Sequence, residues 1–173
     1  MARKKISEFK AKSLLLDALA LPNEAMSFGS SSDFSSIEKL DTSKSYVSKV
    51  DEGVKKRMKN GLVALNKKPS ELKKEIGKLQ SKGYAHFIVE PFIKYDQQSE
   101  MYLSFERVRE GLRVMYSVRG GINIEDNKEH LRKKVVDKVA DLKDVAVHLG
   151  LKETVLAKIV EVFDKYYFSF LKN

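Results

Sequence analysis

Several sequence features are absent from this 173-residue chain, and each absence excludes a class of protein or site. It has no cysteine, which excludes disulfide bonds, thiolate metal sites and cysteine nucleophiles, and which suits a reducing compartment. It has no apolar run of the length that a secretory leader or a membrane span needs, because the leucines at 14–16 lie between Lys12 and Asp17. We therefore expect a soluble, cytoplasmic protein without a membrane partner.

The common catalytic patterns are also missing. No Gly-x4-Gly-Lys-Ser/Thr phosphate loop occurs, and the glycine pair at 120–121 is too little for a dinucleotide fingerprint. The histidines do not have the spacing of a metal site, and no local motif indicates a Ser-His-Asp triad: His86, His130 and His148. We predict no catalytic residue and no metal ligand within the chain.

The composition is that of a folded, basic protein. Apolar residues make up 42%, enough for a core, and the charged 33% is mixed in sign. The formal net charge of +9 favours polyanions such as nucleic acid, an acidic partner or the phosphates of a nucleotide. Lysines on solvated helix faces would give the same total, so the charge alone does not choose among these interpretations.

Periodicity predicts an alternation of helices and strands in the first half. Ser7 can cap a helix over 7–20, and Pro22 ends it. The Ser-rich segment 27–45 has weak periodicity and is predicted to be mobile. Strands are expected at 46–50, 61–66 and 86–93, with an amphipathic helix over 69–82.

The second half is expected to be a hairpin followed by helices. Strands at 101–108 and 112–119 are joined by a short turn at 109–111 that contains glycine. After the glycine pair, helices are predicted at 126–140, 142–149 and 152–171, which makes 126–171 a helical segment. The fold class is α/β (α+β), with a small mixed β-sheet lobe, flanking helices and this C-terminal helical segment.

Two features carry possible chemistry. Pro91 follows a buried-type strand, where it removes a ladder donor and indicates an edge or a hinge; a strand edge can pair with the polar edge of a purine. Glu100, at the start of the next strand, could accept ribose hydroxyls.

Lys49, at the end of a strand, could contact a triphosphate, and the basic residues at 55–59 could close over it. The same sequence patterns would also arise from an edge strand with a surface glutamate and from a solvated basic turn, neither of which binds a nucleotide.

Several segments resemble the ATP-grasp domain of the ATP-citrate lyase and succinyl-CoA ligase β-subunit family. Residues 46–66 are similar to the segment that runs from its phosphate-contacting lysine through a basic loop to a Gly-Leu-Val strand. Residues 87–92 are similar to its hinge strand, and 100–102 to its Glu-Phe-Tyr. The turn at 109–111, residues 120–125 and the opening helix at 6–15 also match, in family order over most of the chain.

The resemblance implies an ATP-grasp-like nucleotide-binding domain over 1–173, with roles for named residues. Lys49 would contact the phosphates of ATP, and Arg57 with Met58 would line the loop near them. Glu90, Pro91 and Ile93 would flank the adenine, and Glu100 would hold the ribose.

The chain also departs from the family. Met58 stands where the family often has glycine, and Arg119 where it often has glutamate. The resemblance implies magnesium with the ATP, but Lys172 stands at the position of the first residue of the Glu-Ile-Asn-Pro motif that supplies its ligands. The family's CoA-ligase domains and phosphorylated histidine have no match, so we expect an incomplete domain that works with further domains or subunits.

The sequence leaves several functions open. The resemblance implies the ATP-binding portion of an ATP-dependent acyl-CoA-forming ligase or a citrate-cleaving enzyme. A non-catalytic basic module on the same fold, holding an acidic protein or nucleic acid, is the alternative. A scaffold that docks a partner through the aromatic cluster at 166–170 is a further one.

Overall fold

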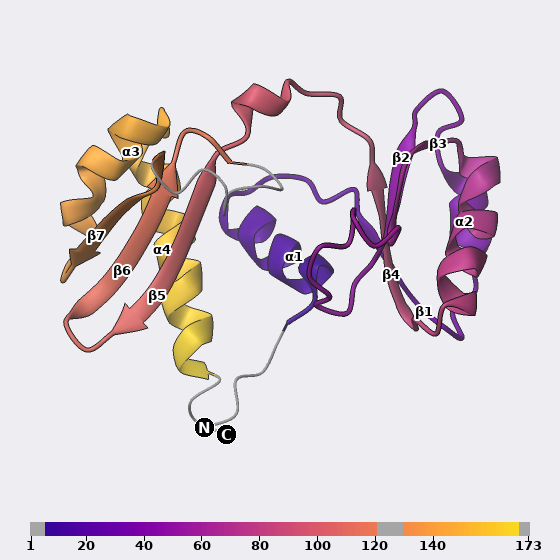
Figure 1. Ribbon diagram of the computed structural model, residues 1–173, viewed down its shortest axis with the longest axis horizontal. Coiled ribbons are helices and arrows are strands. Elements are labelled where there is room, and N and C mark those ends of the chain that lie inside the picture. The colour runs from indigo at the N-terminus through magenta and orange to yellow at the C-terminus, as the bar shows by residue number, and fades with distance from the viewer. Residues whose placement is uncertain (1–5, 121–129, 170–173) are drawn as a thin grey trace. The chain divides into compact units, whose positions relative to one another are not determined.

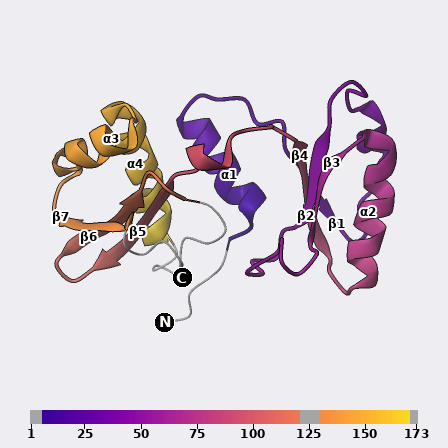
Figure 2. The same cartoon turned by 45° about the horizontal axis from the view of Figure 1, so that its top comes forward.

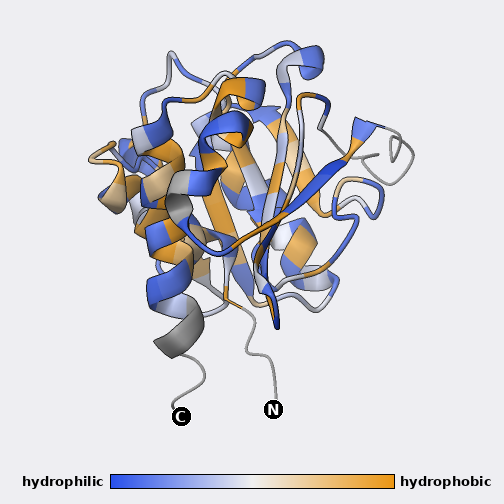
Figure 3. Ribbon diagram, turned by 90° about the vertical axis from the view of Figure 1, so that its left-hand side faces the viewer, coloured by the Kyte–Doolittle hydropathy of each residue, from blue (hydrophilic) through white to orange (hydrophobic). Residues whose placement is uncertain are grey.

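The computed structural model describes residues 6–120 and 130–169. The chain divides into two compact units, Met1–Ile93 and Lys94–Asn173. Each unit has a hydrophobic core of its own. Hydrophobic and hydrophilic residues are interspersed along the strands and helices (Figure 3), as expected for elements that are buried on one side.

The first unit is built on a four-stranded sheet with the order β1-β4-β2-β3. The strands are β1 (Met26–Gly29), β2 (Tyr46–Val50), β3 (Val63–Lys67) and β4 (His86–Pro91). All three pairings are antiparallel. Helix α2 (Pro69–Ser81) covers one face, and α1 (Glu8–Ala18) lies on the other (Figure 1), as the tilted view in Figure 2 also shows.

The two helices of this unit are held in different ways. In α2, Pro69 stands at the first turn and the stripe of Leu72, Ile76 and Leu79 is buried in the core, as the spacing predicts. In α1, the Ser7 side chain accepts a hydrogen bond from the Lys10 amide at 3.2 Å, the cap that the sequence indicates. No residue of α1 is buried. Apolar packing therefore fixes α2 far more firmly than α1.

The Ser-rich segment contains more structure than its composition indicates. It holds most of β1 and a 3-10 helix at Ser35–Lys39. Phe28 and Ile37 lie in the core of the first unit. These two apolar residues are too few to give a periodicity that predicts a strand. The mobility of 27–45 stays a prediction.

The second unit is a three-stranded antiparallel sheet covered by helices. Its strands are β5 (Tyr102–Val108), β6 (Gly111–Ser117) and β7 (Arg132–Val136), in the order β5-β6-β7. Helices α3 (Lys143–Leu149) and α4 (Glu153–Ser169) pack on the face that carries Leu112, Val114 and Tyr116. The hairpin turns where it was predicted, with Gly111 at φ +136°.

One predicted helix is wrong in the described part of the chain. Residues 132–136 of the expected helix 126–140 form β7, paired with β6, and Val139–Leu142 is a 3-10 helix. Val136 is buried whereas Val135 is 42% exposed, so the local pattern has the period of a strand. Lys134 lies on the buried side, with its ammonium group donating to the Asp141 carbonyl at 2.7 Å. A basic residue in an inward position hid the alternation.

The α/β fold class is confirmed, and every strand pair among the described residues is antiparallel. The last helix is confirmed too, and Leu156 and Val160 are buried among its described side chains. The aromatic cluster at 166–170 falls largely outside the described side chains. No helix among the described residues is long and apolar enough to cross a membrane.

Candidate functional site

A group of charged side chains lies on the α1 face of the four-stranded sheet. Tyr46 and Val50 of β2 point into the core below α2, so the alternation of a strand sends Lys49 to the opposite face. Lys49 lies opposite Ile88 of β4, and Glu90 is its diagonal neighbour on that same face. The pairing of β2 with β4 therefore brings the predicted phosphate-contacting lysine beside the predicted hinge glutamate.

Two carboxylates hold the Lys49 ammonium group. Its Nζ lies 2.6 Å from Oε1 of Glu8 and 2.6 Å from Oε1 of Glu90. Lys12, one turn further along α1 than Glu8, bridges the same pair, at 2.8 Å from Glu8 and 2.5 Å from Glu90. The Lys49 side chain is only 14% exposed, and those of Glu8 and Glu90 are 22% and 18% exposed. These contacts lie in a partly desolvated region, where charge pairing is stronger than at an open surface.

Arg57 completes this group and fixes the basic loop after β2. One guanidinium nitrogen donates to the Val50 carbonyl at 2.7 Å, and the other is hydrogen-bonded to Oε2 of Glu8. The Leu62 amide donates to the Arg57 carbonyl at 2.9 Å, which closes the loop. We call Glu8, Lys12, Lys49, Arg57 and Glu90 the ion cluster.

Asp51 binds the start of α1 to the end of β2. Its carboxylate accepts the Glu8 amide at 2.5 Å and the Phe9 amide at 3.1 Å. Free amides at a helix N-terminus and the positive end of the helix dipole both favour a carboxylate there. Because Asp51 directly follows β2 and is only two residues beyond Lys49, this cap holds Glu8 close to Lys49.

The cluster keeps the Glu8 carboxyl strongly ionised. Burial alone would raise its pKa, but the hydrogen bonds from Lys12, Lys49 and Arg57 outweigh burial and lower the pKa from 4.5 to about 2. The pKa of the Lys12 ammonium is raised: burial opposes the charged form, but Glu8 and Glu90 outweigh it. The cluster holds three cations and two carboxylates, so its net charge is positive.

The other predicted site residues of the first unit are more exposed. Met58 is 40% exposed in the basic loop, and Ile93 is 73% exposed beyond β4. Pro91, the last residue of β4, lies opposite Tyr46 of β2. These residues share the unit with the ion cluster, but none of them is part of it.

The expectation of an edge strand at Pro91 is correct only locally. β4 is an interior strand, and its pairing with β1 ends at the match of Val89 with Met26. Glu90 and Pro91 are paired with β2 alone. The lost ladder donor of proline therefore falls where, among the described residues, no strand lies on the second side.

Glu100 belongs to the second unit, outside the ion cluster. Its carboxylate accepts a hydrogen bond from the Tyr95 hydroxyl, which raises the pKa of Tyr95. Its carbonyl accepts the Gly120 amide at 2.7 Å. Of the matched segment at 120–125, residues 121–125 lie outside the described residues.

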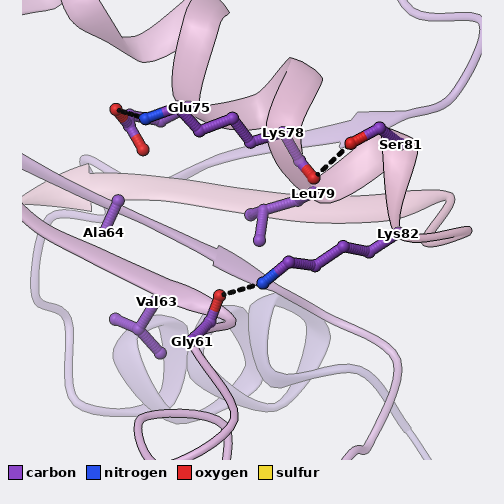
Figure 4. Close-up of a pocket in the computed structure, with 8 residues that line it drawn as sticks. All are labelled: Gly61, Val63, Ala64, Glu75, Lys78, Leu79, Ser81 and Lys82. Atoms are coloured by element: carbon purple, nitrogen blue, oxygen red, sulfur yellow. Dashed lines mark hydrogen bonds and ion pairs between the residues drawn. The ribbon is translucent and has the colours of Figure 1, made fainter.

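A separate hollow of about 320 Å³ lies between α2 and β3. Figure 4 shows its lining, which includes Lys78 paired with Glu75 at 2.7 Å and Lys82 donating to the Gly61 carbonyl at 3.0 Å. Both ammonium groups already have protein partners. Elsewhere, the residues at 6–120 and 130–169 contain no group of three or more His, Cys, Asp or Glu side chains that could hold a metal ion.

No family model matches this chain, but curated proteins are similar to it over about three quarters of its length. The ATP-citrate synthase subunit alpha chain protein 1 of Oryza sativa subsp. japonica is 36% identical over 152 residues, covering 76% of this chain and 36% of its own length. The ATP-citrate synthase of Mus musculus is 30% identical over 150 residues, covering 75% of this chain and 14% of its own length. This chain is a relative of ATP-citrate lyase. It spans about a third of the length of the plant alpha chain and less of the mouse protein.

Solved structures show the same fold. The ATP citrate lyase from Methanothrix soehngenii, in complex with citrate and coenzyme A, superimposes with a TM-score of 0.71 at 21% identity, covering 96% of this chain and 44% of that one. A Pyrococcus horikoshii protein superimposes with a TM-score of 0.60 at 15% identity, covering 90% of this chain and 84% of that one. The relationship to ATP-citrate lyase therefore extends from the sequence to the fold of nearly the whole chain.

Sequence reasoning missed three residues of this site. Glu8, Lys12 and Asp51 were not predicted to belong to it. The spacing of Glu8 and Lys12 along a helix and the position of Asp51 after Lys49 were visible signals. Neither signal predicts that the opening helix packs against β2, and this contact is seen only in the folded structure.

Proposed function

We propose that this chain binds ATP at the ion cluster, as the nucleotide-binding portion of a citrate-cleaving or acyl-CoA-forming enzyme of the ATP-citrate lyase type. The observation that carries the proposal is the convergence of Lys12, Lys49 and Arg57 on a single carboxylate. Three partly desolvated cations at one point favour a polyanionic ligand, and a triphosphate meets that requirement. The relatives, which are ATP-citrate synthases, support ATP as that ligand.

In this proposal Lys49 and Arg57 contact the phosphates, and Met58 lines the loop beside them. Glu90, Pro91 and Ile93 flank the adenine, where the end of β4 has no second neighbouring strand within the part of the chain that the structure describes. The ribose contact of Glu100 stays a prediction from the resemblance, because Glu100 belongs to the other unit. Magnesium accompanies the ATP in the proposal, but no metal-dependent step is assigned to the described residues.

A thermal-shift experiment tests this proposal. A ligand that binds only the folded state at about one hundred times its dissociation constant stabilises it by about 2.7 kcal/mol, so Mg-ATP should raise the melting temperature clearly. Lys49→Ala should abolish the shift. Lys74→Ala is the matched control, because Lys74 is an exposed lysine of α2, on the far face of the sheet.

Two results would contradict the proposal. One is a melting temperature that Mg-ATP leaves unchanged in the wild type. The other is an equal shift in Lys49→Ala and the wild type. Tight, strongly salt-dependent binding of random-sequence DNA without any effect of ATP would favour the basic-module interpretation instead.

A further inference from the structure

The Glu8 carboxylate occupies the position at which the cations of the ion cluster converge. Lys12 and Lys49 bond its Oε1, and Arg57 bonds its Oε2. Both oxygens therefore accept charge-assisted hydrogen bonds from side chains on three different elements. A phosphate oxygen of a bound nucleotide would need the same donors. Glu8 and such a phosphate cannot both be bonded to Lys49 and Arg57 through the same hydrogen atoms.

The helix that carries Glu8 is weakly attached. None of the residues of α1 is buried, whereas α2 buries Pro69, Leu72, Ile76 and Leu79. Side-chain bonds to the sheet side of the unit come from the Asp51 cap, Glu8 and Lys12. An element held by few apolar contacts opens locally at a small free-energy cost. Charge, rather than packing, keeps Glu8 over Lys49.

We propose that Glu8 is an internal competitor of the ligand phosphate: it closes the cation site when the site is empty and must leave Lys49 and Arg57 before a phosphate binds. This inference rests on the proposed function and adds an autoinhibitory contact to it. Phosphate brings more negative charge than one carboxylate, so it displaces Glu8 at sufficient concentration. Displacement loosens the first turn of α1, because one of its three attachments to the sheet is gone.

Titration calorimetry with Mg-ATP tests the competition. Glu8→Gln should bind Mg-ATP about 3- to 10-fold more tightly than the wild type, the effect of replacing a charged competitor by a neutral one. Glu8→Asp keeps the charge but shortens the side chain, and it should also bind more tightly. Asp17→Asn removes an exposed carboxylate of the same helix, so it controls for the general loss of negative charge and should leave the affinity unchanged.

Hydrogen exchange supplies a readout besides affinity. In the wild type, saturating Mg-ATP should speed the exchange of the Lys12 and Ser13 amides. In Glu8→Gln, the exchange of these two amides should already be fast without ligand. The same measurement shows whether the variant is less stable than the wild type.

The outcomes separate this inference from the function on which it rests. Equal or weaker binding by Glu8→Gln and Glu8→Asp, with binding still lost in Lys49→Ala, would overturn the competition and leave the ATP site in place. Unchanged exchange of the α1 amides on ATP binding would overturn it as well. Binding that survives in Lys49→Ala, or binding by neither the wild type nor Glu8→Gln, would overturn both.

Discussion

Replacing Glu8 by glutamine should change the acid stability of the first unit in a specific pH range. The folded protein lowers the pKa of Glu8 from 4.5 to about 2, chiefly because the hydrogen bonds from Lys12, Lys49 and Arg57 outweigh burial. Since the folded pKa lies below the unfolded one, the ionised carboxylate stabilises the fold above about pH 4.5. That contribution is lost as the pH falls towards 2.

The size of the effect follows from the same values. At about 1.4 kcal/mol for each pKa unit, the full difference corresponds to about 3.5 kcal/mol. The side chain of Glu8 is 22% exposed, and solvent screens part of the interaction. We therefore expect Glu8→Gln to lower the free energy of unfolding by about 1–2 kcal/mol at pH 7, and by almost nothing near pH 2.

Urea unfolding at intervals from pH 7 to pH 2 measures this difference. The curves for the wild type and Glu8→Gln should converge as the pH falls below 4.5, whereas Asp17→Asn should follow the wild type throughout. Curves for the wild type and Glu8→Gln that stay parallel over the whole range would refute the reasoning, because they would show that the carboxylate is not held in its ionised form.

Three further changes test other parts of the structure. Asp51→Ala removes the acceptor of the Glu8 and Phe9 amides and should cost about 1–2 kcal/mol in urea unfolding, whereas removal of exposed Asp17 should cost little; equal effects would contradict the cap. Gly111→Ala should destabilise the second unit by about 1–3 kcal/mol, because its Cβ would lie 2.5 Å from the Val136 carbonyl oxygen, whereas Gly77→Ala in α2 has free space and should gain about 0.5–1 kcal/mol. Val136→Ala should lower the melting temperature clearly and Val135→Ala hardly, because only Val136 is buried; the reverse order would argue against β7.

Much of the fold could be predicted because local pattern and tertiary structure agree. The strand at Tyr46–Val50, the helix at Pro69–Ser81 and the hairpin at Gly111 follow directly from apolar spacing, proline and glycine. β7 could not be predicted in this way. Its inward Lys134 interrupts the alternation, and no tight turn joins it to its partner β6, so the pairing that stabilises it has no local signature.

The site was predictable in part for a similar reason. Lys49, Arg57 and Glu90 were indicated by the resemblance, and the structure brings these three side chains into one cluster. The resemblance did not indicate which other charged side chains pair with these three. Glu8 and Lys12 reach the cluster from the opening helix, through a docking that depends on the three-dimensional position of Asp51.

The central claim is that the face of the sheet under α1, and not the hollow beside α2, receives the phosphates of ATP. A titration of the isotopically labelled chain with Mg-ATP, followed through its amide resonances, tests it most directly. The account predicts the largest shifts at 8–12, 47–57 and 88–90. Shifts confined to 61–82, around the hollow between α2 and β3, would contradict it.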